Sequence, residues 1–158
     1  MKIMPEREVI FMNDFKNRQS SEILKSVYKN ADMAYEASGD VLKYCVNSKL
    51  RGEITAERER YRSVASQARA ELVRRGSVPK SYPAYTRLMT KMGIGMKAMQ
   101  DPSAQSLAEM MVRGTTMGII DMTHALNSSS KAVERIRTDA AALLKREQQF
   151  CDNLKKYL

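Results

Sequence analysis

The chain has 158 residues, of which 43% are apolar and 28% charged, so it is long enough to bury a core and too apolar for a disordered protein. Its seven Gly, four Pro and many straight-chain residues favour long helices over a sheet. The sequence has no run of about 18 apolar residues, no signal-peptide core and only two cysteines, so we expect a cytoplasmic protein without a membrane span or a disulfide framework.

The net charge of +9 comes from the middle of the chain. Residues 43–100 hold 13 basic and four acidic side chains, whereas the segments before and after are nearly balanced. Such a segment would suit an anionic partner, such as nucleic acid bound through its phosphates. The other interpretation is a solvated basic face that aids solubility. No nucleic-acid module accompanies the charge, so base reading is not expected.

The N-terminal segment 1–19 shows no sustained apolar period. We expect a flexible extension with at most one short turn, outside a single domain that covers 20–158. Ser20 or Ser21 would cap the first helix, because apolar residues then recur at three- and four-residue spacing as far as about Val46.

The second helix is expected over about 49–75, with Gly76 as the C′ residue that ends it. Two prolines then break the chain, and a short amphipathic helix follows before residue 101. Asp101–Pro102 predicts the start of a third helix that runs to about Leu126. The fourth helix is expected over about 130–157.

Four long patterned segments predict an all-α four-helix bundle. The connection between the second and third helices decides its topology, because a simple turn there would give an up-down-up-down bundle. A helix of about 17 residues would instead span ~25 Å, most of the length of such a bundle. We therefore favour a long crossover between helices two and three, which is the ferritin-like arrangement.

One part of the sequence carries a family resemblance. Ser106–Thr123 (SLAEMMVRGTTMGIIDMT), preceded by Met92–Met96 (MGIGM) and followed by LKKYL at the C-terminus, resembles a family of small bacterial helical-bundle proteins grouped with ferritin-like domains of unknown function. The resemblance implies a four-helix fold with a ferritin-like connection, and it implies no particular activity.

A ferritin-like metal centre needs inward-facing carboxylates together with two Glu-x-x-His pairs, but His124 is the only histidine. In the crossover topology one glutamate per helix falls near a common height, which would suit a di-iron or di-manganese site. The positions of these glutamates around the helix axes are less favourable to such a site, because two of the four side chains lie about 100° away from the core stripes of their helices. The four candidate ligands are Glu36, Glu57, Glu109 and Glu147; the other interpretation is that they are surface charges or a polar pair in the core.

Glu147 lies on the core stripe of the fourth helix. A buried carboxylate there must find a donor or shift its pKa upward, whereas a flanking one would reach solvent. We leave both interpretations open. The side chains that could supply a donor are Tyr28, Tyr35, Tyr61 and Arg58. The candidates for polar positions in the core are Tyr35, Tyr61, Asp121 and His124, the last two forming an Asp-x-x-His pair.

The short helix before residue 101 carries an apolar stripe with four methionines. Met-rich faces sometimes bind partners adaptably, although packing into the core is the commoner use. The candidate partner-binding residues are Leu88, Met89, Met92, Met96 and Met99. The sequence thus predicts a non-enzymatic structural or interaction protein without a cofactor, associating with itself or with a protein partner. The alternatives are a carboxylate-rich di-metal protein or oxidase, and non-specific nucleic-acid binding through 43–100.

Overall fold

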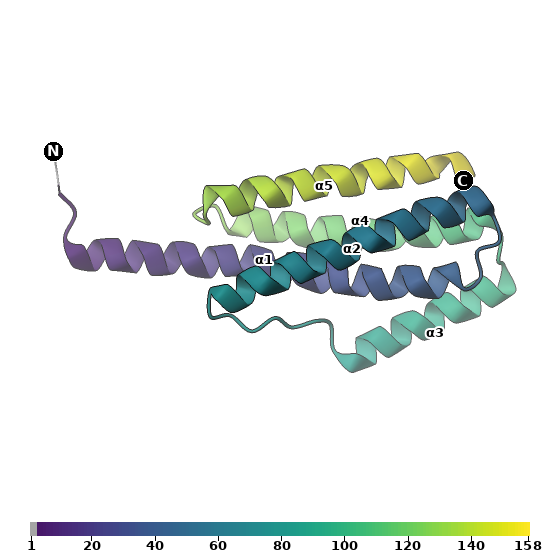
Figure 1. Cartoon of the computed structure of the whole chain (residues 1–158), viewed down its shortest axis with the longest axis horizontal. Coiled ribbons are helices and arrows are strands. Elements are labelled where there is room, and N and C mark those ends of the chain that lie inside the picture. Colours follow the sequence, from purple (N-terminus) through teal and green to yellow (C-terminus); the bar gives the residue numbers. More distant parts are fainter. Residues whose placement is uncertain (1–2) are drawn as a thin grey trace.

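The computed structural model describes residues 3–158, and within this range it contains helices and no strand (Figure 1). The predicted all-helical fold is therefore confirmed. The elements in chain order are α1 (Glu6–Leu42), α2 (Ser48–Arg74), α3 (Ala84–Gln100), α4 (Ala104–Ser128), α5 (Glu134–Leu154) and a short 3₁₀ helix (Lys155–Tyr157).

The long helices form two antiparallel pairs, α1 with α2 and α4 with α5 (Figure 1). Between α2 and α4 the chain runs back along the bundle through the segment 75–83 and α3 (Figure 1). As a result, α2 and α4 both begin at the end of the bundle where α3 ends. Helix α1 contacts α2, α3, α4 and α5, so it is the element around which the others are arranged.

The ends of α2 and α4 follow local chemistry. Gly76 adopts a φ of 73°, and its N–H donates to Val73 while the next N–H donates to Leu72. These two bonds form a Schellman motif, which confirms Gly76 as the C′ residue. Helix α4 begins two residues later than Asp101–Pro102 predicts, because the Ser103 hydroxyl caps it by accepting a 3.1 Å hydrogen bond from the Ser106 N–H.

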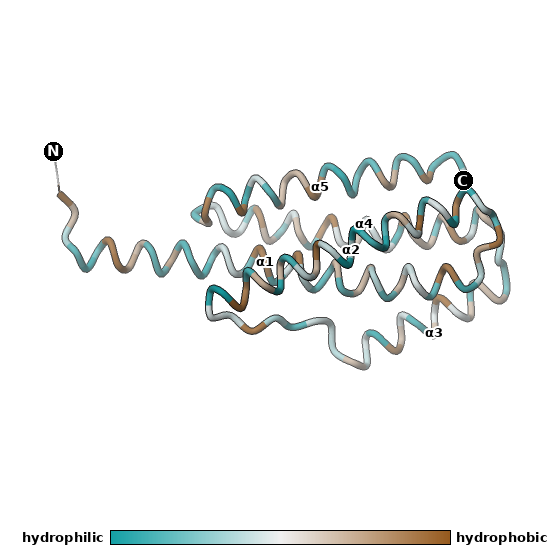
Figure 2. The backbone as a smooth tube through the Cα atoms, in the orientation of Figure 1, coloured by the Kyte–Doolittle hydropathy of each residue, from teal (hydrophilic) through white to brown (hydrophobic). Residues whose placement is uncertain are grey.

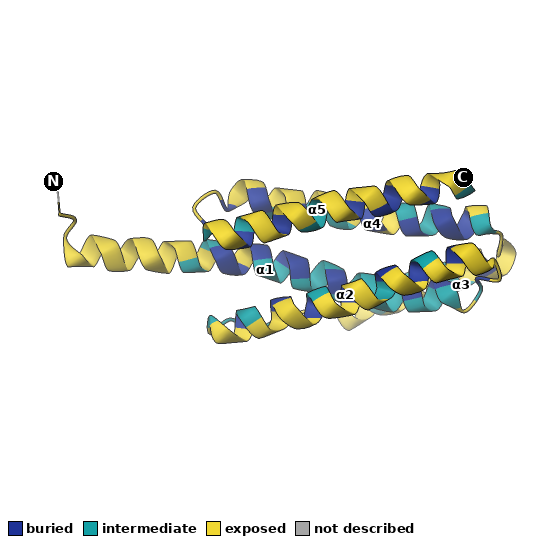
Figure 3. Cartoon of the chain, turned by 45° about the horizontal axis from the view of Figure 1, so that its top comes forward, coloured by how far each residue is buried: buried dark blue, intermediate teal, exposed yellow. Residues whose placement is uncertain are grey.

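The start of α1 differs from the prediction. The helix begins at Glu6, so residues 6–19 are helical where at most one short turn was expected, while residues 1 and 2 lie outside the described part of the chain. This stretch, which we call the arm, extends beyond the bundle and its side chains are nearly all exposed (Figure 3). Apolar residues recur at helical spacing where a helix packs one face against the core of its own chain. The arm does not pack against that core, so its sequence has no such period.

The core consists of two apolar clusters, one toward each end of the bundle. The first includes Leu50, Ile54, Leu107 and Leu154, and the second includes Ile23, Val27, Ala68, Leu126 and Ile136. Along α2, α4 and α5 the stretch between the two clusters is occupied by polar side chains, namely Glu57, Tyr61, Thr115 and Glu147. The bundle thus has a buried polar layer in its middle, between apolar side chains on either side.

Candidate binding pocket

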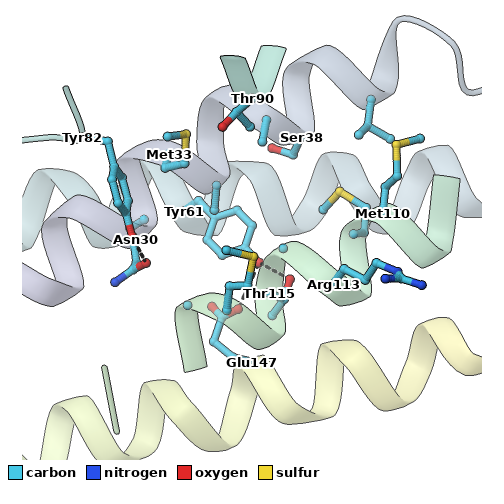
Figure 4. Close-up of a pocket in the computed structure, with 18 of the residues that line it drawn as sticks. Asn30, Met33, Ser38, Tyr61, Tyr82, Thr90, Met110, Arg113, Thr115 and Glu147 are labelled. Carbon is cyan, nitrogen blue, oxygen red and sulfur yellow. Dashed lines mark hydrogen bonds between the residues drawn. The ribbon is translucent and has the colours of Figure 1, made fainter. Parts of the chain in front are cut away.

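The polar layer is organised around the hydroxyl group of Tyr61, which is buried. This hydroxyl donates a 3.0 Å hydrogen bond to Oε2 of Glu147 and lies 3.3 Å from the Thr115 hydroxyl. The three side chains come from α2, α5 and α4, and Figure 4 shows the Glu147 carboxyl pointing from α5 toward the other two. Of the donors considered from the sequence, Tyr61 is therefore the one that reaches Glu147, and the interpretation that Glu147 reaches solvent is wrong.

A second carboxyl group, that of Glu57, is buried one helical turn before Tyr61 on α2. Its Oε2 accepts a 2.7 Å hydrogen bond from Nη1 of Arg60, whose own side chain is exposed. Glu57 therefore has a cationic partner that reaches in from the surface, whereas the donor to Glu147 is an uncharged hydroxyl. A charge on Glu57 is consequently paired with a hydrogen-bonded cation, whereas no described cation is hydrogen-bonded to Glu147 and Arg146 acts on it only through its charge.

This difference appears in the pKa values. Burial raises the pKa of Glu147 from its ordinary value of 4.5 to about 7, and the charge of Glu57 acts in the same direction, while the hydrogen bond from Tyr61 opposes them. Burial, followed by the charge of Glu147, raises the pKa of Tyr61 well above its ordinary range. Tyr61 thus stays a hydrogen-bond donor, and Glu147 is present both as a neutral acid and as a carboxylate near pH 7.

A cavity of about 420 Å³ reaches this layer. Its walls are formed mainly by α1, α3 and α4, with two side chains each from α2 and α5. Most lining side chains are small or apolar, including Ala31, Ala34, Met110 and Met111, and Tyr61, Thr115 and Glu147 supply polar groups (Figure 4). Gly114 also lines the cavity, and a Cβ atom at this position would meet no atom within 4 Å.

The segment 75–83 and α3, together called the crossover, cover one side of this cavity. They are attached to α1 by polar contacts. The Tyr82 hydroxyl donates a 3.2 Å hydrogen bond to Oδ1 of Asn30 (Figure 4), Ser81 donates to Asp32, and the Arg87 guanidinium pairs with Glu36. Tyr82 and Asn30 both line the cavity. These contacts hold the crossover against α1 while little apolar surface of α3 is buried, since Ala98 is the buried residue of that helix.

The four predicted metal ligands do not converge. Glu57 and Glu147 share the polar layer, but Glu36 is paired with Arg87 on the crossover and Glu109 with Arg113 on its own helix. Among the described residues no three or more His, Cys, Asp or Glu side chains are grouped as a metal site would require. The prediction that four carboxylates meet is therefore wrong, because two of them point away from the core, as their rotation about the helix axes indicated.

The predicted polar positions of the core have different outcomes. Asp121 is half-buried and joins α4 to α1, because its Oδ2 accepts hydrogen bonds of 2.7 Å from Ser26 and 2.6 Å from Asn30. Burial raises its pKa, but these bonds and the charge of Lys29 outweigh that effect and lower it. His124 is exposed, so placing it in the core was wrong.

Tyr35 is half-buried and lies outside the polar layer. Its ring stacks under the guanidinium of Arg58, whose carbon lies 3.9 Å from the ring centroid. Arg58 also donates a 3.2 Å hydrogen bond to the backbone carbonyl of Tyr35. Both residues therefore support the contact between α1 and α2, and neither reaches Glu147.

The five apolar side chains of α3 singled out from the sequence are exposed, from 49% for Met89 to 75% for Met99. Figure 2 shows α3 at the outside of the bundle. The five side chains do not line the cavity, so they form a surface separate from it. A role of this face in binding a partner stays a prediction.

Sequence reasoning missed Thr115 and the cavity. Thr115 carries a weak signal, since a Thr four residues after the core residue Met111 falls on the core stripe of α4. The cavity has no local signal, because it results from how α1, α3 and α4 are spaced. Two glycines of α4 line this space, and the Cβ position of Gly114 faces open space while that of Gly118 would lie 3.6 Å from Asn30.

No family model, no curated protein and no solved structure matches this chain. The resemblance to ferritin-like domains of unknown function therefore stays a prediction. Across the described residues no helix is long and apolar enough to cross a membrane. The site must accordingly be interpreted from its own geometry.

Proposed function

We propose that this protein binds a small, uncharged and mostly apolar molecule in the cavity, with one oxygen atom of the ligand facing Glu147. The observation that carries the proposal is the convergence of apolar walls on a buried hydrogen-bonding group of three residues, Tyr61, Thr115 and Glu147. Pockets for small molecules combine such walls with a few convergent polar groups. A volume of about 420 Å³ lies within the usual range for them.

The buried polar groups favour an uncharged ligand, because the two cations that line the cavity, Lys97 and Arg113, are both paired with Glu109. One oxygen of Glu147 already accepts from Tyr61, and no side chain of the described residues donates to the other. In its neutral form Glu147 has a proton to donate to a ligand carbonyl or hydroxyl oxygen. A ligand that accepts this proton would favour the neutral form of Glu147, so binding should weaken as the pH rises above 7. A wholly apolar ligand would show no such dependence.

The experiment is a fluorescence titration with Nile red, an uncharged apolar dye that carries a carbonyl group. We expect saturable binding to the wild type. In Gly114→Leu the side chain extends into the cavity without a Cβ clash, and we expect the affinity to fall at least about tenfold. The matched control is Gly52→Leu on α2, whose Cβ position is also open but which does not line the cavity.

Both substitutions replace a helical glycine by a better helix former, so neither should unfold the protein. Unchanged dye binding by Gly114→Leu would refute the pocket proposal, because the dye would then occupy another surface such as the exposed face of α3. Loss of binding in both variants would refute it as well, because the loss would not depend on the cavity.

We also propose that the bundle is of the ferritin type but acts without a metal centre. The support is the path of the chain, with α2 and α4 starting at the same end and α3 in the connection between them (Figure 1). Spin labels on Lys49→Cys and Gln105→Cys, two exposed positions near those starts, test the topology. A short inter-label distance supports the crossover, and a separation near the length of the bundle refutes it. Bound iron or manganese at stoichiometric level would refute the second half of the proposal.

A further inference from the structure

The arm of α1 exposes more apolar surface than a solvated helix accounts for. Its five large apolar side chains, all at least 38% exposed, are Val9, Ile10, Phe11, Met12 and Phe15. Residues 6–19 extend along ~21 Å of helix, as an unbroken continuation of the part of α1 inside the bundle. Exposed aromatic side chains grouped on such a helix indicate an interaction surface.

The two aromatic side chains share one face of α1, because Phe11 and Phe15 are four residues apart. Ser20, Ile23 and Val27 mark the face that α1 packs into the bundle. At about 100° per residue the aromatic pair is rotated roughly 140° away from that face. The bundle of the same chain therefore does not cover the pair, and the surface is free for another molecule.

We propose that the occupant is a second copy of this chain. Its arm packs antiparallel to the first, about a two-fold axis that crosses the helices at the height of residue Asn13. In this register Phe11 of each copy faces Phe15 of the other, so both aromatic residues become buried in one small core. Glu8 of each copy faces Arg18 of the other. The contact is isologous and closes on two copies.

Charge along the arm favours the antiparallel orientation. On the aromatic face, acidic Glu8 precedes the pair and basic Arg18 follows it, whereas Glu6 and Lys16 lie on other sides of the helix. Antiparallel arms bring the acidic end of each copy to the basic end of the other, whereas parallel arms would place like charges side by side. Across residues 3–19 three acidic and three basic side chains balance. A helix that lies on anionic lipid normally carries a basic excess instead.

The length of the arm fits the same register. With the axis at Asn13, residue 6 of one copy lies opposite residue 20 of the other. Helix α1 begins at Glu6, and its first buried residues are Ser20 and Ser21. The arms therefore overlap along the stretch that precedes the first buried residues, and each bundle begins where the arm of the other copy ends. Within this stretch, Asn17 and Gln19 accept hydrogen bonds from the Arg75 side chain and the Lys131 N–H of their own bundle.

Sedimentation equilibrium of the full chain at micromolar concentration tests the proposal. We expect a monomer–dimer equilibrium for the wild type. Phe15→Ser should weaken the dimer at least about fiftyfold, because a buried aromatic residue at the centre of a small contact dominates its affinity. Val9→Ser is the matched control. Val9 lies on the opposite side of the arm and is exposed to a similar extent, 43% against 38% for Phe15, so its replacement should change the dissociation constant less than about twofold.

A charge exchange tests the orientation. Glu8→Arg alone and Arg18→Glu alone should each weaken self-association about tenfold, because each brings like charges together at both ends of the contact. Mixing the two single variants should restore a dimer, since every opposing pair then has opposite signs. Parallel arms would already place Glu8 of one copy beside Glu8 of the other in the wild type, so in that arrangement neither single substitution should weaken self-association.

The proposal is overturned if the wild type is monomeric at about 100 µM. It is also overturned if Met96→Ser on α3 abolishes the dimer while Phe15→Ser does not. If the full wild-type chain is monomeric in solution and binds phosphatidylserine vesicles, the proposal is overturned and the aromatic pair is assigned to a membrane surface instead.

Discussion

Tyr61 on α2 donates a 3.0 Å hydrogen bond to Glu147 on α5, in a layer of the bundle with an apolar cluster on either side. The bond satisfies one oxygen of a buried acid without neutralising its charge. The carboxyl group is therefore held in place but remains costly to ionise. The structure combines this titratable group with a cavity that reaches it. The stability of the fold and the proposed binding of a ligand should therefore depend on the same proton.

The stability of the protein should fall as the pH rises from about 4.5 to 7. Glu147 has a pKa of about 7 when folded and 4.5 when unfolded, so the folded state holds the proton more tightly. This contribution is fully present below pH 4.5 and absent above the folded pKa, a change of about 3 kcal/mol in the free energy of unfolding. Urea denaturation across this range measures it.

In Glu147→Gln the same fall should be missing, because the amide does not titrate. The exposed Glu59→Gln is the matched control and should keep the fall. A Glu147→Gln variant that loses as much stability over this interval as the wild type would contradict the assignment of Glu147.

Replacing Tyr61 by Phe removes the donor to Glu147 and leaves the ring in place. We expect a loss of about 1–3 kcal/mol in the free energy of unfolding, larger above pH 7 where Glu147 is ionised and needs the bond most. Tyr85→Phe is the control, because Tyr85 is 73% exposed. Equal losses at pH 5 and pH 8 would show that the hydroxyl does not act through the carboxylate.

Replacing Asp121 should destabilise the protein much more than replacing His124, although the two residues belong to one Asp-x-x-His pair. Asp121→Ala leaves Ser26 and Asn30 without their acceptor between α1 and α4, so thermal unfolding should show a loss of about 1–3 kcal/mol. His124→Ala at an exposed position should change the stability by less than about 0.5 kcal/mol. Comparable losses for the two variants would mean that the histidine has a partner.

Gly76→Ala should destabilise the protein by about 1 kcal/mol. The residue has a φ of 73°, which an L side chain adopts only with strain, and the Cβ atom itself meets nothing within 4 Å. Gly52→Ala within α2, where the Cβ is equally free, should instead stabilise by about 0.5–1 kcal/mol. The opposite signs separate the backbone effect from any steric one, and differential scanning calorimetry of both variants records them.

The sequence by itself determined the long helices and several of their ends. Apolar residues at three- and four-residue spacing marked α2, α4 and α5, and Gly76 marked the end of α2, because these features depend on a few neighbouring residues. It also placed Glu147 on a core stripe and named Tyr61 among its possible donors. The helical arm was not predicted, because a helix that does not pack on the core of its own chain has no apolar residues recurring along one face.

Only the tertiary structure decided which of these side chains meet. The sequence placed four glutamates near one height and two of them away from their core stripes. The structure decided the partners: Glu36 and Glu109 pair with arginines, while Glu57 and Glu147 lie inside. The choice of Tyr61 as the donor and the cavity beside it depend on how far apart α1, α3 and α4 lie. Such distances are set by packing between residues remote in the chain, and local spacing carries no record of them.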